Sequence, residues 1–133
     1  MNLAEIFLAV SAAYHLPANL LTKICFVESS HRTNMITQDT NGRKSMGVCQ
    51  IQHRTAKAMG FKGEEKELLN PYVNISYAGA YLSHQYNRYG NWIKAVKAYN
   101  AGFAKTNEPN HYYRKVHSVD LENKIPRLLA CVK

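Results

Sequence analysis

One acidic side chain, Glu28, lies where the sequence otherwise places core residues. Leu21, Ile24, Cys25 and Glu28 follow one another at helical spacing, so one helical face carries three apolar residues and then a carboxylate. Apolar neighbours disfavour the charged form of a carboxyl group, and the last turn of a helix lies at the negative end of its dipole. Both effects raise the pKa of Glu28. A carboxylic acid of raised pKa can donate a proton near neutral pH, as cleavage of a glycosidic bond requires.

Polar residues farther along the chain offer groups that can hold a sugar. Gln50 follows a glycine-containing turn, and Tyr99 and Asn100 join an aromatic hydroxyl and an amide at a predicted helix end. Each has a simpler structural alternative: Gln50 as a hydrogen bond at a helix entry, and Tyr99 as a core residue. For Glu28 the alternative is a helix-end ion pair with Arg32.

Apolar spacing and helix-ending residues predict the elements that must position these side chains. Residues 3–14 and 17–29 form two helices, and Pro17 suits the first turn of the second. Residues 30–45 are polar and aperiodic, which is typical of a long functional loop. Further helices are expected at 53–59, 71–89, 92–101, 112–119 and 121–132, the last interrupted at Pro126. In the helix over 71–89 the predicted common face consists of Val73, Tyr77, Ala80, Tyr81 and His84.

These elements and the composition indicate one globular domain over residues 1–133. Of the 133 residues, 46% are hydrophobic, which is enough for a core without disulfide bonds. Alternating β-type runs are absent, so the expected fold class is all-α, or α with minimal β. We expect a monomer.

The charge balance indicates an anionic partner. There are 17 basic and 9 acidic residues, a formal net charge of +8. The basic residues never form a run of five, which argues against a nucleic-acid-binding arm. A small patch of Tyr86, Arg88, Tyr89 and Lys94 is explained more easily by helix-end packing. We therefore expect no nucleic-acid partner.

Three cysteines, Cys25, Cys49 and Cys131, make an odd count without CxxC spacing. We expect neither a metal site nor a cofactor, and we expect all three to be small buried residues, although Cys49 and Cys25 can lie close together. No apolar run is long enough for insertion into a membrane. The N-terminus lacks the basic start of a secretory signal, so delivery by another route, or a mature form or fragment, is expected.

Four ordered blocks resemble the catalytic domain of soluble lytic transglycosylases, which has a lysozyme-like helical fold related to goose-type lysozymes. The resemblance runs from about Leu3 to Val116. Its blocks are Glu28-Ser29, Ser45-Met46-Gly47-Val48-Cys49-Gln50-Ile51, Asn74-Ile75 with Gly79 and Tyr81-Leu82, and Ala98-Tyr99-Asn100-Ala101-Gly102. Val48 and Cys49 replace the usual Leu-Met, and both replacements keep the apolar character of the cleft wall.

The resemblance implies a role for each matched residue. Glu28 is the only catalytic carboxylate, first acid and then base, and Ser29 supports it or contacts substrate. Residues of the other blocks contact the saccharide, namely Ser45, Gln50, Tyr99 and Asn100. A late tyrosine approaches the glutamate in that family, and Tyr113 is the favoured match, with Tyr112 the less favoured register.

By the same resemblance the substrate is the glycan of bacterial peptidoglycan, cut between N-acetylmuramic acid and N-acetylglucosamine with formation of a 1,6-anhydro sugar. The first alternative is a hydrolysing muramidase, for which Asp39 is the best candidate second carboxylate, although we favour Asp39 as a turn former. A noncatalytic wall-binding module is another alternative, and a nucleic-acid binder ranks last.

The expected place of action is the periplasm or the cell wall. A bacteriophage lysis or virion protein, or a protein associated with secretion, is the expected source, because no signal peptide is visible.

Overall fold

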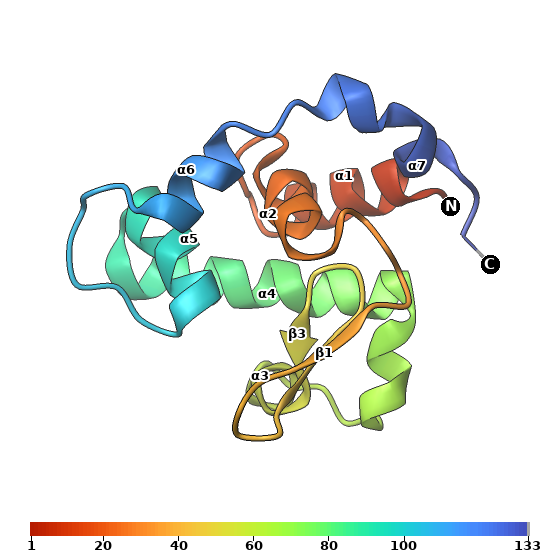
Figure 1. Cartoon of the computed structure of the whole chain (residues 1–133), viewed down its shortest axis with the longest axis horizontal. Coiled ribbons are helices and arrows are strands. Elements are labelled where there is room, and N and C mark those ends of the chain that lie inside the picture. The colour runs from red at the N-terminus through yellow and green to blue at the C-terminus, as the bar shows by residue number, and fades with distance from the viewer. Residues whose placement is uncertain (133) are drawn as a thin grey trace.

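The computed structural model describes residues 1–132, which form seven α-helices, two 3₁₀ helices and three short strands (Figure 1). The bounds in chain order are α1 (Leu3–Ala13), α2 (Leu20–Ser29), β1 (Ile36–Gln38), β2 (Lys44–Met46), β3 (Ile51–Gln52), α3 (His53–Ala58), η1 (Glu65–Leu69), α4 (Pro71–Tyr89), α5 (Trp92–Ala101), α6 (His111–His117), η2 (Leu121–Lys124) and α7 (Ile125–Leu129). The expected fold class, helical with minimal β, is confirmed.

Local sequence signals account for most helix boundaries. Asn2 begins α1, where its side chain and that of Glu5 form a reciprocal capping box. Asn70 caps α4, Pro71 is its first residue, and Gly90 ends it in the left-handed conformation at φ 65°. The predicted start of the second helix at Pro17 is wrong: α2 begins at Leu20, because Asn19 precedes it with a left-handed backbone at φ 66°.

The polar segment predicted as a loop instead contains most of a small antiparallel sheet. In β1 and β2, Ile36 pairs with Met46, and β2 then pairs with β3 through Met46 and Ile51. The strands are only two or three residues long, and all of β1 is exposed. No apolar alternation can mark such strands, which is why the sequence did not predict them.

Helix α4 crosses the middle of the molecule, with α1 and α2 above it and the sheet and α3 below it in the view of Figure 1. Its buried residues include Asn74, Ile75, Ala78 and Leu82, so the predicted common face is displaced, and His84 is exposed. The displacement arises because α4 has two covered sides: Val73, Tyr77 and Tyr81 pack on a second, smaller cluster.

Two apolar clusters form the core. The larger one lies among α1, α2, α4 and α5, and the smaller one lies among the sheet, α3, η1 and α4. Gly79 permits the close approach of α1 to α4, because a Cβ there would clash with Val10. Within residues 1–132, no helix combines the length and apolar character that a membrane crossing needs.

The cysteines depart from the prediction. Cys25 of α2 and Cys49 are buried but are joined by a disulfide, so they are not free apolar side chains. Cys131 is exposed, and its backbone forms an isolated antiparallel β-bridge with Asn2. This bridge brings the two ends of the chain together (Figure 1).

Candidate active site

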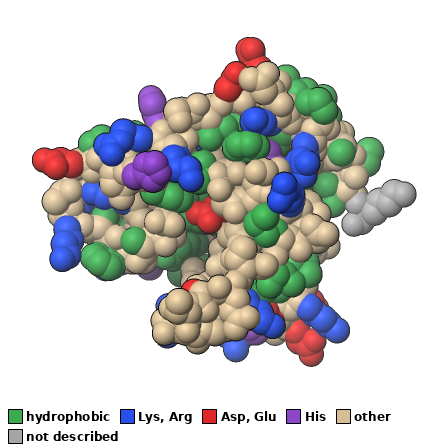
Figure 2. Space-filling model, viewed as in Figure 1, with side chains coloured by type: hydrophobic (Ala, Val, Ile, Leu, Met, Phe, Trp, Pro, Cys, Tyr) green, Lys and Arg blue, Asp and Glu red, His purple; other side chains and the backbone are tan. Residues whose placement is uncertain are grey.

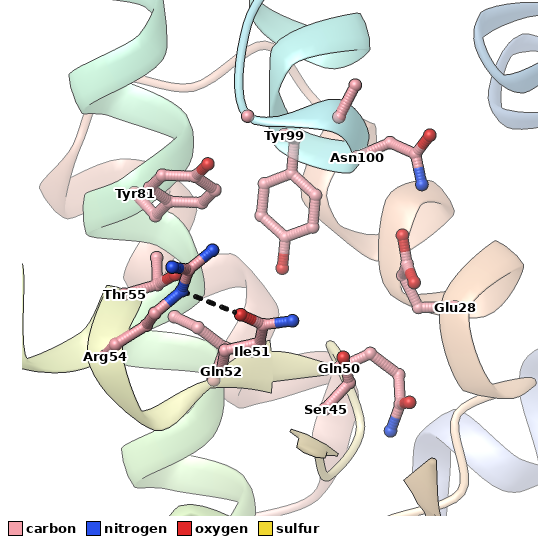
Figure 3. A pocket seen from close by; sticks show the side chains of 12 residues that line it. Glu28, Ser45, Gln50, Ile51, Gln52, Arg54, Thr55, Tyr81, Tyr99 and Asn100 are labelled. Carbon is pink, nitrogen blue, oxygen red and sulfur yellow. Dashed lines mark hydrogen bonds between the residues drawn. The ribbon is translucent and has the colours of Figure 1, made fainter. Parts of the chain in front are cut away.

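A cleft of about 280 Å³ separates the sheet and α3 from the ends of α2 and α5 (Figure 3). Segments that are distant in the sequence contribute its lining. The lining residues are Glu28, Ser45, Gln50, Ile51, Gln52, Arg54, Thr55, Tyr81, Tyr99, Asn100, Ala101 and Gly102.

Glu28 lies in the last turn of α2 and is partly buried at the edge of the cleft. Burial raises the pKa of its carboxyl, while a hydrogen bond from Tyr112 and the charge of Lys115 oppose that rise. The Tyr112 hydroxyl donates to Glu28 Oε2 at 2.6 Å. Among the described residues no Lys or Arg nitrogen lies within 4.0 Å of the carboxylate, so the alternative ion pair with Arg32 is not formed.

The tyrosine beside Glu28 is Tyr112 and not Tyr113, the register that the sequence favoured. Consecutive helical residues point about 100° apart, so only one of the two can reach Glu28. Tyr113 instead stacks on His117, with the ring centroids 6.0 Å apart, and lies beside Pro17 and Leu20. Burial raises the pKa of Tyr112, as does the negative charge of Glu28, so its hydroxyl keeps its proton and acts as a donor.

Tyr99 and Asn100 have different environments although they are adjacent. The Tyr99 ring is almost fully buried, and its hydroxyl donates to the Cys49 carbonyl at 2.8 Å. Its ring also packs against Tyr81, with centroids 5.4 Å apart. Tyr99 therefore combines the predicted cleft position with the alternative core role. Asn100 is exposed, and Figure 3 shows its amide on the same side of the cleft as Glu28.

Gln50 borders the cleft, but its amide hydrogens are already used. Its Nε2 donates to the carbonyls of Met35 and Gly47 at 3.1 and 2.9 Å, and its Oε1 accepts from Thr37 at 2.7 Å. The backbone of Gln50 is left-handed, at φ 54°. These hydrogen bonds hold the turn against β1. Gln50 thus has a structural role, similar to the helix-entry hydrogen bond that is its alternative interpretation. Ser45, on β2, lines the cleft opposite Gln52 in the sheet register.

Ser29 is buried behind the cleft and does not line it. Its hydroxyl donates to the Val48 carbonyl at 2.6 Å, which ties the end of α2 to the segment after β2. Asn74 holds the same segment from α4: its amide donates to the Met46 carbonyl at 2.6 Å and accepts from the Cys49 N–H at 2.8 Å. Ser29 therefore anchors the last turn of α2, which carries Glu28, and its own side chain lies outside the cleft lining.

Asp39 lies at the tip of the β1–β2 hairpin and not in the cleft. Its Oδ1 accepts from the backbone N–H groups of Asn41 and Arg43, both at 2.9 Å, as a turn former does. Glu28 is consequently the only carboxylate that lines the cleft within residues 1–132. The same residues contain no cluster of three His, Cys, Asp or Glu that could hold a metal ion.

Four polar side chains of the cleft were missing from the predicted site: Gln52, Arg54, Thr55 and Tyr81. Three of them belong to β3 and the first turn of α3, which directly follow the Gln50 turn. The available signal in the sequence was the predicted helix start at residue 53, because the first turn of a helix that begins beside a cleft lies next to that cleft. Tyr81 was assigned to a packing face, and it does pack there as well as reaching the cleft.

Comparison with known proteins identifies relatives of this chain. A family model described as the transglycosylase SLT domain matches residues 5–120. The "X polypeptide" of Escherichia coli is 30% identical over 109 residues, which are 80% of this chain and 64% of the relative. The "X polypeptide" of Escherichia coli strain K12 is 31% identical over 99 residues, 73% of this chain and 59% of the relative. The chain thus spans a little under two thirds of these curated relatives.

Two solved structures have the same fold. An inactive mutant of the lytic transglycosylase Slt from Pseudomonas aeruginosa is 25% identical with a TM-score of 0.65, and the match covers 74% of this chain and 16% of that one. The 70-kDa soluble lytic transglycosylase of Escherichia coli is 24% identical with a TM-score of 0.64, and it covers 93% of this chain and 19% of that one. The latter similarity shows the lysozyme-like fold alone.

Proposed function

Because this chain belongs to the transglycosylase SLT domain family, we propose that it is a lytic transglycosylase that cleaves the glycan of bacterial peptidoglycan. The bond cut is the β-1,4 linkage between N-acetylmuramic acid and N-acetylglucosamine. Glu28 is the catalytic residue, and the cleft between α3 and the ends of α2 and α5 holds the glycan. Support comes from the family match and from a partly buried carboxyl of raised pKa at the cleft edge.

Glu28 performs both proton transfers in this proposal. In its acid form it protonates the bridging oxygen while the bond from that oxygen to C1 of the muramyl sugar breaks. The resulting carboxylate then takes the proton of the muramyl C6 hydroxyl, whose oxygen bonds to C1. The products are a new 4-hydroxyl end and a 1,6-anhydro sugar, no water is consumed, and Glu28 regains its proton.

The two carboxylate oxygens of Glu28 have different roles in this proposal. Oε2 accepts the hydrogen bond from Tyr112, whereas Oε1 has no hydrogen-bond partner within residues 1–132 and is open to substrate. The Tyr112 hydrogen bond favours the carboxylate, and burial favours the acid. A group balanced between the two forms suits successive roles as acid and base.

The observation that favours an intramolecular nucleophile is the single carboxylate of the cleft. Hydrolysing glycosidases of the common retaining and inverting classes use two carboxyl groups that flank the bond. The best second candidate, Asp39, accepts two backbone hydrogen bonds at the hairpin tip outside the cleft lining. We therefore favour the transglycosylase over the muramidase.

The test is digestion of purified peptidoglycan followed by mass spectrometry of the soluble muropeptides. Anhydro products are lighter by one water than reducing-end products, so the spectrum separates the two reactions. We expect anhydro products from the native chain, none from Glu28→Gln, and unchanged yield from Glu122→Gln, an exposed control outside the cleft. Reducing ends alone would assign a muramidase, and firm wall binding without turnover would assign a binding module.

We further propose that residues 1–133 form one domain and that the chain is a monomer. It acts in the periplasm or the cell wall, within a bacteriophage lysis or virion system or a secretion apparatus. The location of peptidoglycan supports the place of action. Sedimentation of the purified chain tests the oligomeric state, and cell fractionation in the native host tests the location.

A further inference from the structure

A second groove, of about 320 Å³, adjoins the cleft and shares two of its residues, Gln52 and Arg54. We call it the basic groove. Its walls come from the end of the β1–β2 hairpin, from α3 and from the start of η1. Its lining residues are Gly42, Arg43, Lys44, Gln52, His53, Arg54, Lys57 and Glu65.

The charges of the basic groove are strongly unequal. Arg43, Lys44, Arg54 and Lys57 line it, against the one carboxylate of Glu65. Among the described residues, none of these four cations forms a salt bridge within 4.0 Å. Cations that share a groove without acidic partners repel one another, and an anionic ligand relieves that repulsion.

Arg54 connects the groove to the cleft. It lies in the first turn of α3 and is exposed, and its Nε donates to Gln52 Oε1 at 3.1 Å (Figure 3). This hydrogen bond orients the guanidinium, and neither terminal nitrogen donates to a described residue. Two parallel N–H groups of a guanidinium match the two oxygens of a carboxylate.

We infer that the basic groove binds a carboxylate on the muramyl substituent of the glycan, with Arg54 as its first contact. The inference rests on the proposed function and deepens it by naming the part of the substrate that the enzyme selects. Because Gln52 and Arg54 line both the cleft and the groove, the group that binds in the groove is attached to the glycan in the cleft. Because four cations line the groove, that group is acidic.

Two carboxylates have the required chemistry. One belongs to the amino acids of the peptide branch, and the other is the lactyl carboxylate, which is free only where the peptide has been removed. Neither touches the bond that is cut. The groove therefore contributes to substrate binding, and its loss raises KM while leaving kcat nearly unchanged.

The experiment compares three forms of the same soluble glycan strands. The first carries peptides with free carboxylates, the second has those carboxylates converted to methylamides, and the third has been treated with an amidase that leaves lactyl carboxylates. We expect the native chain to prefer the first form over the second by roughly three- to tenfold in kcat/KM, the size expected of partly exposed charge pairs. Cleavage of the third form like the second identifies the peptide carboxylate as the ligand, whereas a preference for the third form over the other two identifies the lactyl carboxylate.

The variants locate the preference. Arg54→Gln should cleave the first two forms equally, Arg54→Lys should keep part of the preference, and Lys57→Gln should reduce it. Lys62→Gln is the matched control, because Lys62 is exposed, carries the same charge and lies outside the groove lining. Circular dichroism of each variant shows that the fold is retained.

Equal cleavage of all three forms by the native chain overturns the inference, and so does a preference that survives in Arg54→Gln. Failure of the proposed function has a different signature: the native chain then releases nothing from any of the three forms, as does Glu28→Gln. An active enzyme that shows no carboxylate preference would therefore contradict the role of the basic groove and leave the proposed function intact.

Discussion

At the scale of single residues, the proposed chemistry depends on opposing influences on one carboxyl. Burial raises the pKa of Glu28, and Tyr112 and Lys115 pull it down. A stronger acid would not hold its proton near neutral pH and would leave a weak base for the second step, whereas a weaker acid would be a poor proton donor in the first. The balance depends on the contact between α2 and α6 that places Tyr112 on Glu28.

Replacement of Tyr112 by phenylalanine tests that balance. The variant loses a hydrogen bond that lowers the pKa of Glu28, so the pKa rises further and Glu28 keeps its proton to higher pH. We expect the high-pH limb of the kcat/KM profile to move to higher pH, with roughly tenfold lower activity at the optimum. The measurement is muropeptide release across pH, and Tyr113→Phe, whose ring stacks on His117, should leave the profile in place.

The same raised pKa predicts a cost in stability at neutral pH. The folded chain holds a proton on Glu28 that the unfolded chain releases, so stability is present below the ordinary glutamate pKa and falls as pH rises through the raised one. Glu28→Gln removes that charge, and its thermal midpoint should exceed that of the native chain at pH 7 but match it at pH 4. A native chain as stable as the variant at both pH values would contradict the burial of Glu28.

At the scale of elements, the segment from Met46 to Gln50 is the best-anchored part of the site. Helix α2 holds it through the disulfide and Ser29, α4 through Asn74, and α5 through Tyr99. Gly47 makes its turn possible, since its backbone is left-handed at φ 76° and a Cβ would meet Asn74. Met46, Gly47, Val48 and Cys49 therefore shape the cleft wall from behind and do not line the cleft.

The disulfide should contribute measurably to that anchoring. Cys25 and Cys49 are separated by 24 residues, and closing a loop of that size stabilises a folded chain by about 3 kcal/mol. We expect the Cys25→Ala, Cys49→Ala pair to lose about that much free energy of unfolding in urea titrations. Cys131→Ala is the control, because Cys131 is exposed and unpaired within residues 1–132. Equal midpoints for the pair and the native chain would show that the bond is absent in solution.

At the scale of the whole molecule, positive charge is not confined to the basic groove. Figure 2 shows Lys and Arg side chains around the visible face, and the net charge is +8. Such a field attracts a polyanionic wall from a distance and is screened by salt. The field speeds encounter, whereas Glu28 and the cleft determine the reaction.

Salt should therefore affect large and small substrates differently. Raising the ionic strength from about 0.02 to about 0.5 M shortens the screening length severalfold, and we expect slower digestion of whole cell walls. A short neutral oligosaccharide lacks the distant charges, so its cleavage rate should change little. Parallel rate measurements on both substrates check this, and equal salt sensitivity would place the effect inside the cleft instead.

The sequence alone determined the features that depend on neighbouring residues. Asn2, Asn70, Pro71 and Gly90 set helix ends through local hydrogen bonds and backbone preferences, and the stripe that ends in Glu28 follows from helical spacing. The Glu28-Ser29 pair and the three ordered blocks after it were enough to identify the family. Each of these signals is complete within a few turns of chain.

Only the tertiary structure decided the features that join distant segments. The choice of Tyr112 over Tyr113 requires a contact across 84 residues, and Tyr99 reaches Cys49 across 50. The side-chain amide of Gln50 donates to the Met35 carbonyl and accepts from the Thr37 hydroxyl. Arg54 lines the cleft because α3 begins beside the cleft. Local spacing does not contain these facts, because they depend on how the helices pack around α4.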